Sequence, residues 1–235
     1  MSRSPLKAAA ATAAWDYNMS KRMTGIIFLL VGFLFGVGVL WFSFGGITGQ
    51  ELSLSVTGVK ASSETDNTER VDLVNLAIEI NNYLRDRNYE ALSGSIHPEY
   101  NLVFSPYATI NLTTAKWFSA DEVKRLGRDD TVYTWGTFDG TTKPIEMVFD
   151  EYYEKFIYDK DYSLAPIISV NNIVESGNAL ENIEDVFPEA QYVEFHYPNS
   201  DISGENSDWG TLRLVFERYN DTFALTAIVH SAWTA

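Results

Sequence analysis

The residues best suited to acid–base chemistry lie near the C-terminus of the sequence. Glu194 and His196 are two positions apart in QYVEFHY, so on a strand their side chains point to the same face of a sheet. A carboxylate and an imidazole that reach one substrate are the groups that general acid–base catalysis needs. His230, near the end of the last predicted strand, could join them at the mouth of a cavity. The alternative, an ordinary strand surface that faces solvent with His230 as a structural histidine, is the one we favour.

A calcium loop is the other chemistry that residue spacing suggests. In NSDISGENSDWG, Asn199, Asp201 and Ser203 hold positions one, three and five of such a loop. Gly204 holds position six, but position twelve is Gly210 instead of glutamate. We therefore favour a polar hairpin loop and predict no metal site. We predict no cofactor either, since the sequence has no cysteine, no G-x-S-x-G elbow, no phosphate-binding glycine loop and no dinucleotide fingerprint.

Aromatic side chains are concentrated in FDEYYEKFIYDKDY, residues 149–162. Four of them recur at positions i, i+3, i+4 and i+7, which predicts the buried face of one helix: Phe149, Tyr152, Tyr153 and Phe156. Tyr158 and Tyr162 fall outside that stripe. Together with Trp233 they are the candidates for contact with a ligand, because they could border the mouth of a cavity.

These side chains must be positioned by a mixed set of elements. Helical spacing of apolar residues predicts one or two helices in residues 71–92. Ser119 and Glu122 have the spacing of a capping box, which predicts a short helix at about 120–126. Asp139-Gly140 predicts the turn of a hairpin. The stretches QYVEFHY, TLRLVFERY and TFALTAIVHSAW predict three closing strands. Early helices and late antiparallel strands indicate one α+β domain in residues 70–235.

The N-terminal part differs from this domain. The uncharged run from Ile26 to Phe44 has nineteen residues, enough to cross the hydrocarbon layer of a bilayer. It predicts a transmembrane helix over residues 25–44, between a tail (1–24) and a linker (45–69). Apolar positions along its length are Ile26, Leu30, Phe35, Leu40 and Phe44.

The flanks of this run predict its orientation and its fate. Lys21 and Arg22 precede it and an acidic domain follows, so the positive-inside rule places the N-terminus in the cytoplasm. A cleaved signal peptide is the alternative, but the run is long and lacks an A-x-A-like site, which favours an uncleaved signal anchor. Gly32 and Gly36 form a G-x-x-x-G, a spacing that allows self-association of membrane helices.

The net charge excludes one class of partner. The whole chain carries −15, and residues 1–50 contribute +3, which leaves −18 for residues 51–235. A domain this acidic repels nucleic acid. Without cysteine, it must also be held together by packing alone.

Five stretches of residues 70–235 are together similar to an uncharacterised extracytoplasmic domain of bacterial membrane-anchored proteins and lipoproteins: FSPYATI (104–110), VYTWGTFDG (132–140), EYYEKFIYDKDYSLAP (151–166), SGNALEN (176–182), and LRLVFERY with the terminal IVHSAWT. The resemblance implies a place in the bacterial cell envelope but no activity and no site residue. The order of elements also resembles the nuclear-transport-factor-two-like superfamily, which implies a cone-like fold with helices packed on a curved antiparallel sheet. Lipoprotein members need an N-terminal cysteine, which this chain lacks.

Three functions are consistent with these observations. The first is a single-pass protein of the bacterial cytoplasmic membrane whose extracytoplasmic domain binds a protein partner or a small ligand without catalysis. The second is a hydrolase or isomerase that uses Glu194, His196 and His230 around an aromatic pocket. The third is a scaffold subunit of a membrane assembly. We expect the first, with the lipid bilayer as a partner through residues 25–44.

Overall fold

The structure of the chain is a computed structural model that describes residues 64–200 and 208–233. By its internal contacts the chain divides into two compact units, Met1–Gly58 and Val59–Ala235, and all described residues belong to the second unit. The predicted tail, the membrane segment with Gly32 and Gly36, and most of the linker lie outside the described residues. So do the calcium candidates Asp201 and Ser203.

Within the described residues, no helix combines the length and the apolar character needed to cross a membrane.

Two helices open the second unit, as predicted. They are α2, Glu64–Arg85, and α3, Tyr89–Gly94. Four apolar residues of α2 at helical spacing are fully buried: Leu73, Ala77, Ile80 and Leu84. The helix begins at Glu64, inside the stretch that the sequence assigned to the linker. Its polar first turns continue from the buried ones, because extending a helix is much easier than starting one.

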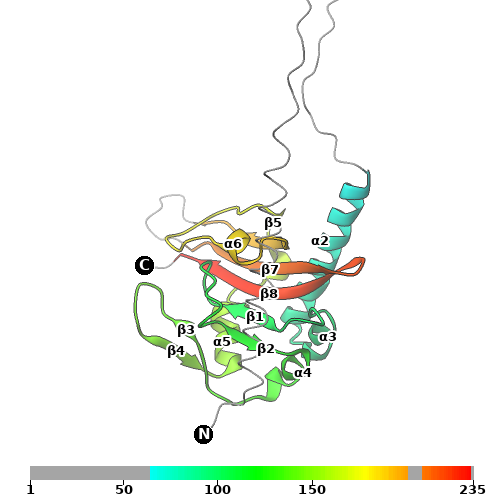
Figure 1. Cartoon of the computed structure of the whole chain (residues 1–235). Helices are drawn as coiled ribbons and strands as arrows, with labels where there is room; N and C mark the ends of the chain where they lie inside the picture. The colour runs from blue at the N-terminus through cyan, green and yellow to red at the C-terminus, as the bar shows by residue number, and fades with distance from the viewer. Residues whose placement is uncertain (1–63, 201–207, 234–235) are drawn as a thin grey trace, which may run out of the picture. The chain divides into compact units, whose positions relative to one another are not determined.

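Six strands form one sheet in the order β2-β1-β8-β7-β6-β5 (Figure 1). Their bounds are Leu102–Ser105 (β1), Lys116–Phe118 (β2), Ile167–Val170 (β5), Gln191–Tyr197 (β6), Gly210–Tyr219 (β7) and Thr222–Ala232 (β8). The three closing strands pair antiparallel, as predicted. The prediction of an antiparallel sheet was incomplete, however, because β1 pairs with β8 in parallel. Residue periodicity within a strand does not report the direction of its partner.

The elements between β2 and β5 also follow the sequence pattern. The capping box is present at α4, Ala120–Val123, which is followed by a 3₁₀ turn, η1, Leu126–Arg128. The Asp139-Gly140 turn joins β3, Tyr133–Thr137, to β4, Pro144–Met147. α5, Phe149–Phe156, buries the four rings of the predicted stripe. A second 3₁₀ turn, η2, Tyr162–Leu164, and a short helix, α6, Ile183–Val186, complete the domain.

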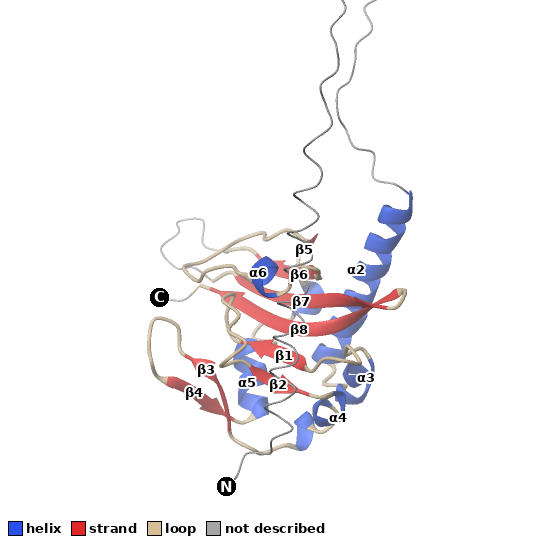
Figure 2. Cartoon of the chain, viewed as in Figure 1, coloured by secondary structure: helices blue, strands red, loops and turns tan. Residues whose placement is uncertain are grey.

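Each face of the six-stranded sheet packs against a different set of elements. One face, with Phe104, Phe195 and Leu212, joins the larger core with α2, α3 and α5. The other face, with Val103, Tyr192 and Val215, packs against the smaller core that includes Ile110 and α6. Figure 2 shows β7 and β8 as long curved ribbons with α2 crossing behind them and α6 in front. The described domain is therefore α+β, with helices packed on a curved, mostly antiparallel sheet.

Candidate functional site

The first acid–base candidate, Glu194, is buried on the face of the sheet that packs against α6. Its side chain has no exposed surface, and it lies 2.7 Å from a guanidinium nitrogen of Arg213, which is equally buried. Arg213 also contacts Glu181 at 2.7 Å, and the backbone N–H of Val174 donates to Glu194 Oε1. The prediction of a solvent-facing strand surface was wrong, because residues 171–190 cover this face. The charge of Glu194 serves an internal ion pair.

His196 lies on the same face, two residues further along β6, and it is also buried. Its Nδ1 is 2.8 Å from the hydroxyl of Thr211, and its Nε2 is 3.3 Å from a carboxylate oxygen of Glu175. Burial lowers the pKa of His196, although Glu194 and Glu175 act in the opposite direction. A neutral ring suits this position, since Nε2–H faces the carboxylate and Nδ1 can accept from Thr211.

His230 points to the opposite face of the sheet. It pairs with Leu212 of β7, and its ring meets that of Phe156 from α5 at a centroid distance of 6.0 Å. Its Nε2 is 3.3 Å from Asp159 Oδ1, and burial of this carboxyl is outweighed by His230 and Tyr162, so the pKa of Asp159 is lowered. The sheet therefore separates His230 from Glu194 and His196, and these three side chains do not converge on one cavity.

Two of the three predicted ligand contacts are engaged within the domain. Tyr162 is fully buried and donates a hydrogen bond to Asp159. Tyr158 stacks on Tyr153 and accepts from the backbone N–H of Ser163. Trp233 is 45% exposed. None of the three candidates, Tyr158, Tyr162 and Trp233, lines either of two hollows on the described part of the chain.

Metal ligands are not clustered in the part of the chain that the structure describes. No group of three or more His, Asp or Glu side chains there could hold a metal ion. Asn199, the described member of the calcium candidates, accepts a hydrogen bond from the backbone N–H of Asp208. The observed contact is that of a polar loop.

The larger of these hollows is an open groove of about 820 Å³, which lies where the turn between α2 and α3 meets η1 and the start of α5. That volume is in the range of small-molecule sites. We call it the basic groove, because four of the thirteen Lys and Arg of residues 51–235 line it. Its lining consists of Arg87, Lys124, Arg125, Arg128, Glu90, Asp129, Asp150, Asn88, Tyr89 and Gly127.

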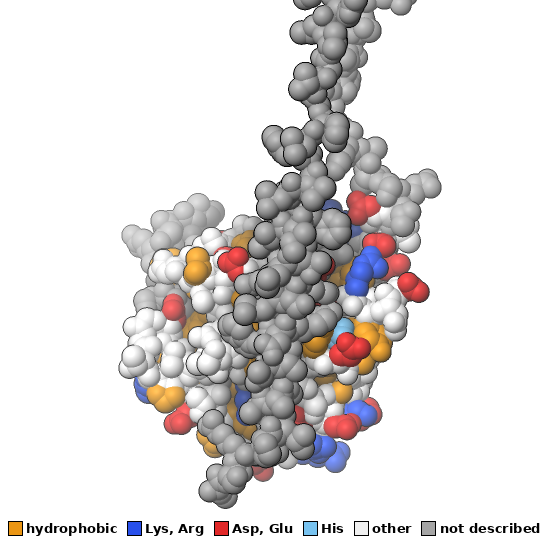
Figure 3. Space-filling model, in the orientation of Figure 1, with side chains coloured by type: hydrophobic (Ala, Val, Ile, Leu, Met, Phe, Trp, Pro, Cys, Tyr) orange, Lys and Arg blue, Asp and Glu red, His pale blue; other side chains and the backbone are white. Residues whose placement is uncertain are grey.

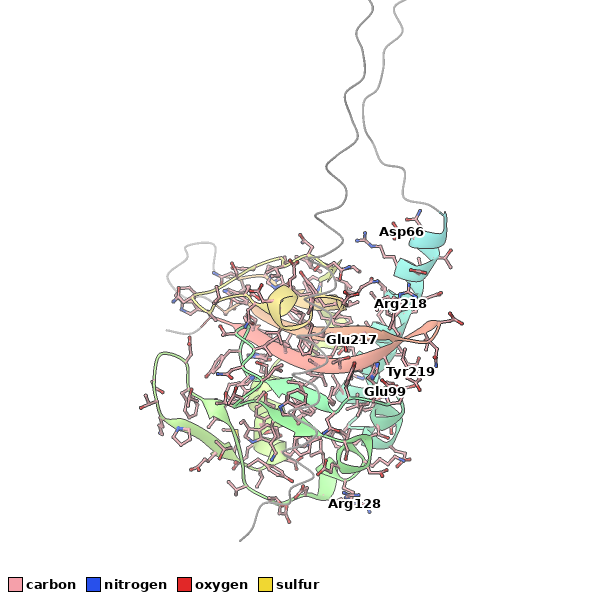
Figure 4. The ribbon with its side chains drawn as sticks, in the orientation of Figure 1. Asp66, Glu99, Arg128, Glu217, Arg218 and Tyr219 are labelled. Carbon is pink, nitrogen blue, oxygen red and sulfur yellow. The ribbon has the colours of Figure 1, made fainter. Side chains whose placement is uncertain are left out.

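Local structure places these side chains. Arg87 ends α2 with a φ of 51°, the left-handed conformation that often terminates a helix. The capping box of Ser119 and Glu122 starts α4, whose last residues lead into the η1 turn. The N–H of Arg128 donates to the carbonyl of Arg125 at 2.9 Å, which closes that turn. Figure 4 shows Arg128 at the opposite end of the domain from Asp66, near the start of α2.

The four cations of the basic groove differ in whether they form ion pairs with neighbouring carboxylates. Arg87 makes ion pairs of 3.1 Å with Asp150 and with Glu154, and Lys124 lies 3.3 Å from Glu90. Arg125 and Arg128 are exposed, and neither makes an ion pair with a described residue. Figure 3 shows Lys and Arg side chains at the lower right end of the domain, interspersed with Asp and Glu.

Tyr89 contributes a buried polar atom to the groove. The residue is 6% exposed, and its hydroxyl has no hydrogen-bond partner among the described residues. Burial raises the pKa of this phenol, so it stays protonated and can donate. Gly127 lies against the ring, since a Cβ at this position would be 2.7 Å from Tyr89 Cε2. The close approach requires glycine here.

The smaller hollow, of about 220 Å³, lies between the segment after β1 and the β3–β4 hairpin. Ser105, Thr109 and Thr141 line it, and all three hydroxyls donate to backbone carbonyls. The sequence stretches FSPYATI and VYTWGTFDG meet here, and Asn182 of SGNALEN bonds both backbone groups of Ile110. These stretches therefore hold the domain together.

Sequence reasoning missed the basic groove. The signal that could have found it is the run KRLGR, residues 124–128, which places three cations in five positions of a strongly acidic domain. Its contact with Tyr89 is visible only in the fold.

Comparisons with known proteins add little. No family model matches the sequence, and no curated protein matches it. One similar solved structure is a putative calcium/calmodulin-dependent protein kinase II association domain from Xanthomonas campestris. It shares 11% identity, with a TM-score of 0.32, over 74% of this chain and 91% of that one. A likeness of this size carries no conclusion about fold family or function.

Proposed function

We propose that the chain is a membrane-anchored extracytoplasmic domain that binds a ligand without transforming it, and that the basic groove is its binding site. The observation that carries the proposal is that the acid–base candidates lie apart from one another and away from the basic groove. The acid–base candidates are divided between the two faces of the sheet and engaged in internal contacts. The basic groove instead is lined by arginines and a lysine, and none of these three acid–base candidates lines it.

The anchor is the second part of the proposal. Residues 25–44 hold the chain in the bacterial cytoplasmic membrane, with the N-terminus in the cytoplasm and the domain outside. The uncharged run and the preceding Lys21 and Arg22 support this arrangement. A cone-like fold belongs to the same proposal, supported by helices that pack on one face of a curved sheet.

The binding site can be tested by blocking the groove. The chain has no cysteine, so an Arg128→Cys variant can carry a bulky maleimide at one position. A screen of small molecules by thermal shift on the full chain, in neutral detergent micelles, would first find ligands that raise the Tm. We expect the labelled Arg128→Cys variant to lose this effect.

The matched control is Arg70→Cys with the same label, since Arg70 is exposed on α2 and does not line the groove. We expect it to respond like the unmodified chain. A ligand that stabilises the blocked variant as well as the control would place the site elsewhere. Conversion of a bound ligand to a product, detected by mass spectrometry, would favour the enzyme instead.

The anchor is tested by fractionation. The full chain should sediment with membranes and resist alkaline carbonate, while a variant that lacks residues 25–44 should be released. A full chain that leaves the membrane in carbonate contradicts the anchor.

A further inference from the structure

We infer that the basic groove binds a phosphate or sulfate ester, and that Arg125 and Arg128 make the charged contacts to it. The inference rests on the proposed function and names the ligand class of the same site.

The first step is the geometry of the η1 turn. Arg125 and Arg128 are three residues apart, and side chains at this separation in a 3₁₀ turn eclipse one another. Leu126, between them, is 1% exposed and fixes the turn to the core. Arg125, the N-cap residue, and Arg128, the last residue of η1, are therefore joined by a closed turn that is held in place, and both line the groove.

The second step is the engagement of the neighbouring charges. Asp129, next to Arg128, accepts hydrogen bonds from Tyr133 and from the backbone of Thr131. Glu90 and Asp150 lie in ion pairs with Lys124 and Arg87. The carboxylates of the groove thus have partners of their own. The charge of Arg125 also helps to lower the pKa of Asp129, but neither Arg125 nor Arg128 makes an ion pair with a described residue, so both guanidinium groups can bind a ligand.

The third step is the number of ligand oxygen atoms to which these two guanidinium groups can donate hydrogen bonds. One arginine satisfies both oxygens of a carboxylate in a bidentate pair. Two arginines together suit an anion with three oxygens, such as a phosphate or sulfate ester. Tyr89 also lines the groove, and its buried hydroxyl has no hydrogen-bond partner among the described residues. A ligand oxygen that reached this hydroxyl would satisfy it.

Binding of inorganic pyrophosphate to the full chain, measured by calorimetry in neutral detergent micelles, tests the inference. We expect binding to the wild type and at least about tenfold weaker binding to an Arg125→Gln/Arg128→Gln variant. A matched control, Arg70→Gln/Lys143→Gln, loses the same charge outside the groove and should stay within about twofold. Hydrogen exchange should show protection of residues 124–129 in the wild type and in the matched control, but not in the Arg125→Gln/Arg128→Gln variant.

Two further experiments compare a lipid headgroup with free pyrophosphate, and a carboxylate with a phosphate. Mixed micelles that contain phosphatidylglycerol, without pyrophosphate, show whether a lipid headgroup protects residues 124–129. Citrate, a carboxylate of similar charge, should bind more weakly than pyrophosphate. Protection by either phosphate source supports the inference, and protection by neither overturns it.

Equal binding of pyrophosphate to the groove variant and to the control also overturns it, as does citrate that binds as tightly as pyrophosphate. These failures differ from failure of the proposed function. An uncharged ligand that is displaced by the label at position 128 would leave the groove as the binding site and reject only the anion.

Discussion

At the scale of single residues, Arg213 is the side chain on which the buried polar contacts depend. It is fully buried and pairs with Glu194, also fully buried, and with Glu181, which is 15% exposed. We expect Glu194→Ala to destabilise the domain by about 3–5 kcal/mol, because it removes one partner of a buried charge. Urea denaturation measures this.

A double variant tests whether Arg213 and Glu194 are coupled. Arg213→Met combined with Glu194→Leu removes both charges and should cost much less than the sum of the two single changes. Additive costs would mean that the two side chains are not coupled.

A second prediction at this scale concerns the stability of a Gly127 variant. We expect Gly127→Ala to cost about 1–3 kcal/mol, because the new Cβ would lie 2.7 Å from the ring of Tyr89. Gly94, at the end of α3, is the matched control, since a Cβ there meets nothing within 4 Å. Equal urea midpoints for the two alanine variants would contradict the close approach.

Burial of His196 should make the stability of the domain depend on pH. Burial lowers the pKa of His196 in the folded domain, so the unfolded chain, with a pKa of about 6.5, binds the proton more readily. Stability contributed by the neutral ring is complete above that pH and is lost as the pH falls below it. Glu175, Glu194 and Arg213 are the charged groups around the ring.

We expect the urea midpoint of the wild type to fall between pH 7 and pH 5, and His196→Asn to reduce the slope. His97, whose pKa is also lowered by burial, leaves a remaining slope in both proteins. The same slope with and without His196 would show that the ring is not buried neutral.

At the scale of elements, α4 and η1 act together, because the capping box fixes the helix from which the turn continues. The Ser119 hydroxyl accepts from the N–H of Glu122, and the Glu122 carboxylate accepts from the N–H of Ser119. We expect Ser119→Ala to cost about 1 kcal/mol and to increase hydrogen exchange over residues 120–128. Glu122→Gln keeps the acceptor and should cost less. Comparable exchange in both variants would contradict this role.

The elements also show which features of the fold local sequence patterns can predict. The stripe of α5, the capping box of Ser119 and the Asp139-Gly140 turn were predictable, because each depends on residues within a few positions of one another. The parallel pairing of β1 with β8 was not, since it joins segments far apart in the chain. The contact of Gly127 with Tyr89 was unpredictable for the same reason.

Burial of Glu194 and His196 shows the same limit. Their positions two apart on one strand predicted that they share a face, and we favoured a face open to solvent, as is common for one side of an antiparallel sheet. Residues 171–190 cover that side, and Arg213 of the neighbouring strand supplies the charge that makes burial of Glu194 tolerable. Neither contact follows from the spacing of residues along β6.

At the scale of the whole molecule, the two cores define what must be present for folding. Both consist, among the described residues, of side chains from Leu73 to Val229. The compact unit that contains them begins at Val59. We therefore expect residues 59–235 to fold alone, because all the described side chains of both cores lie within this unit.

We expect a chain that starts at Val59 to unfold cooperatively with a Tm within about 2 °C of the full chain, since neither core loses a described side chain. A chain that starts at Asn88 lacks α2 and with it Leu73, Ala77, Ile80 and Leu84, each fully buried. Loss of Leu73, Ile80 and Leu84, at about 1.5–3 kcal/mol each, and of Ala77, at less, is comparable to the whole stability of an ordinary domain, and this chain should not fold. A marked fall in Tm for the first truncation would show that residues 1–58 stabilise the domain, whereas a folded second truncation would show that α2 is dispensable to the core.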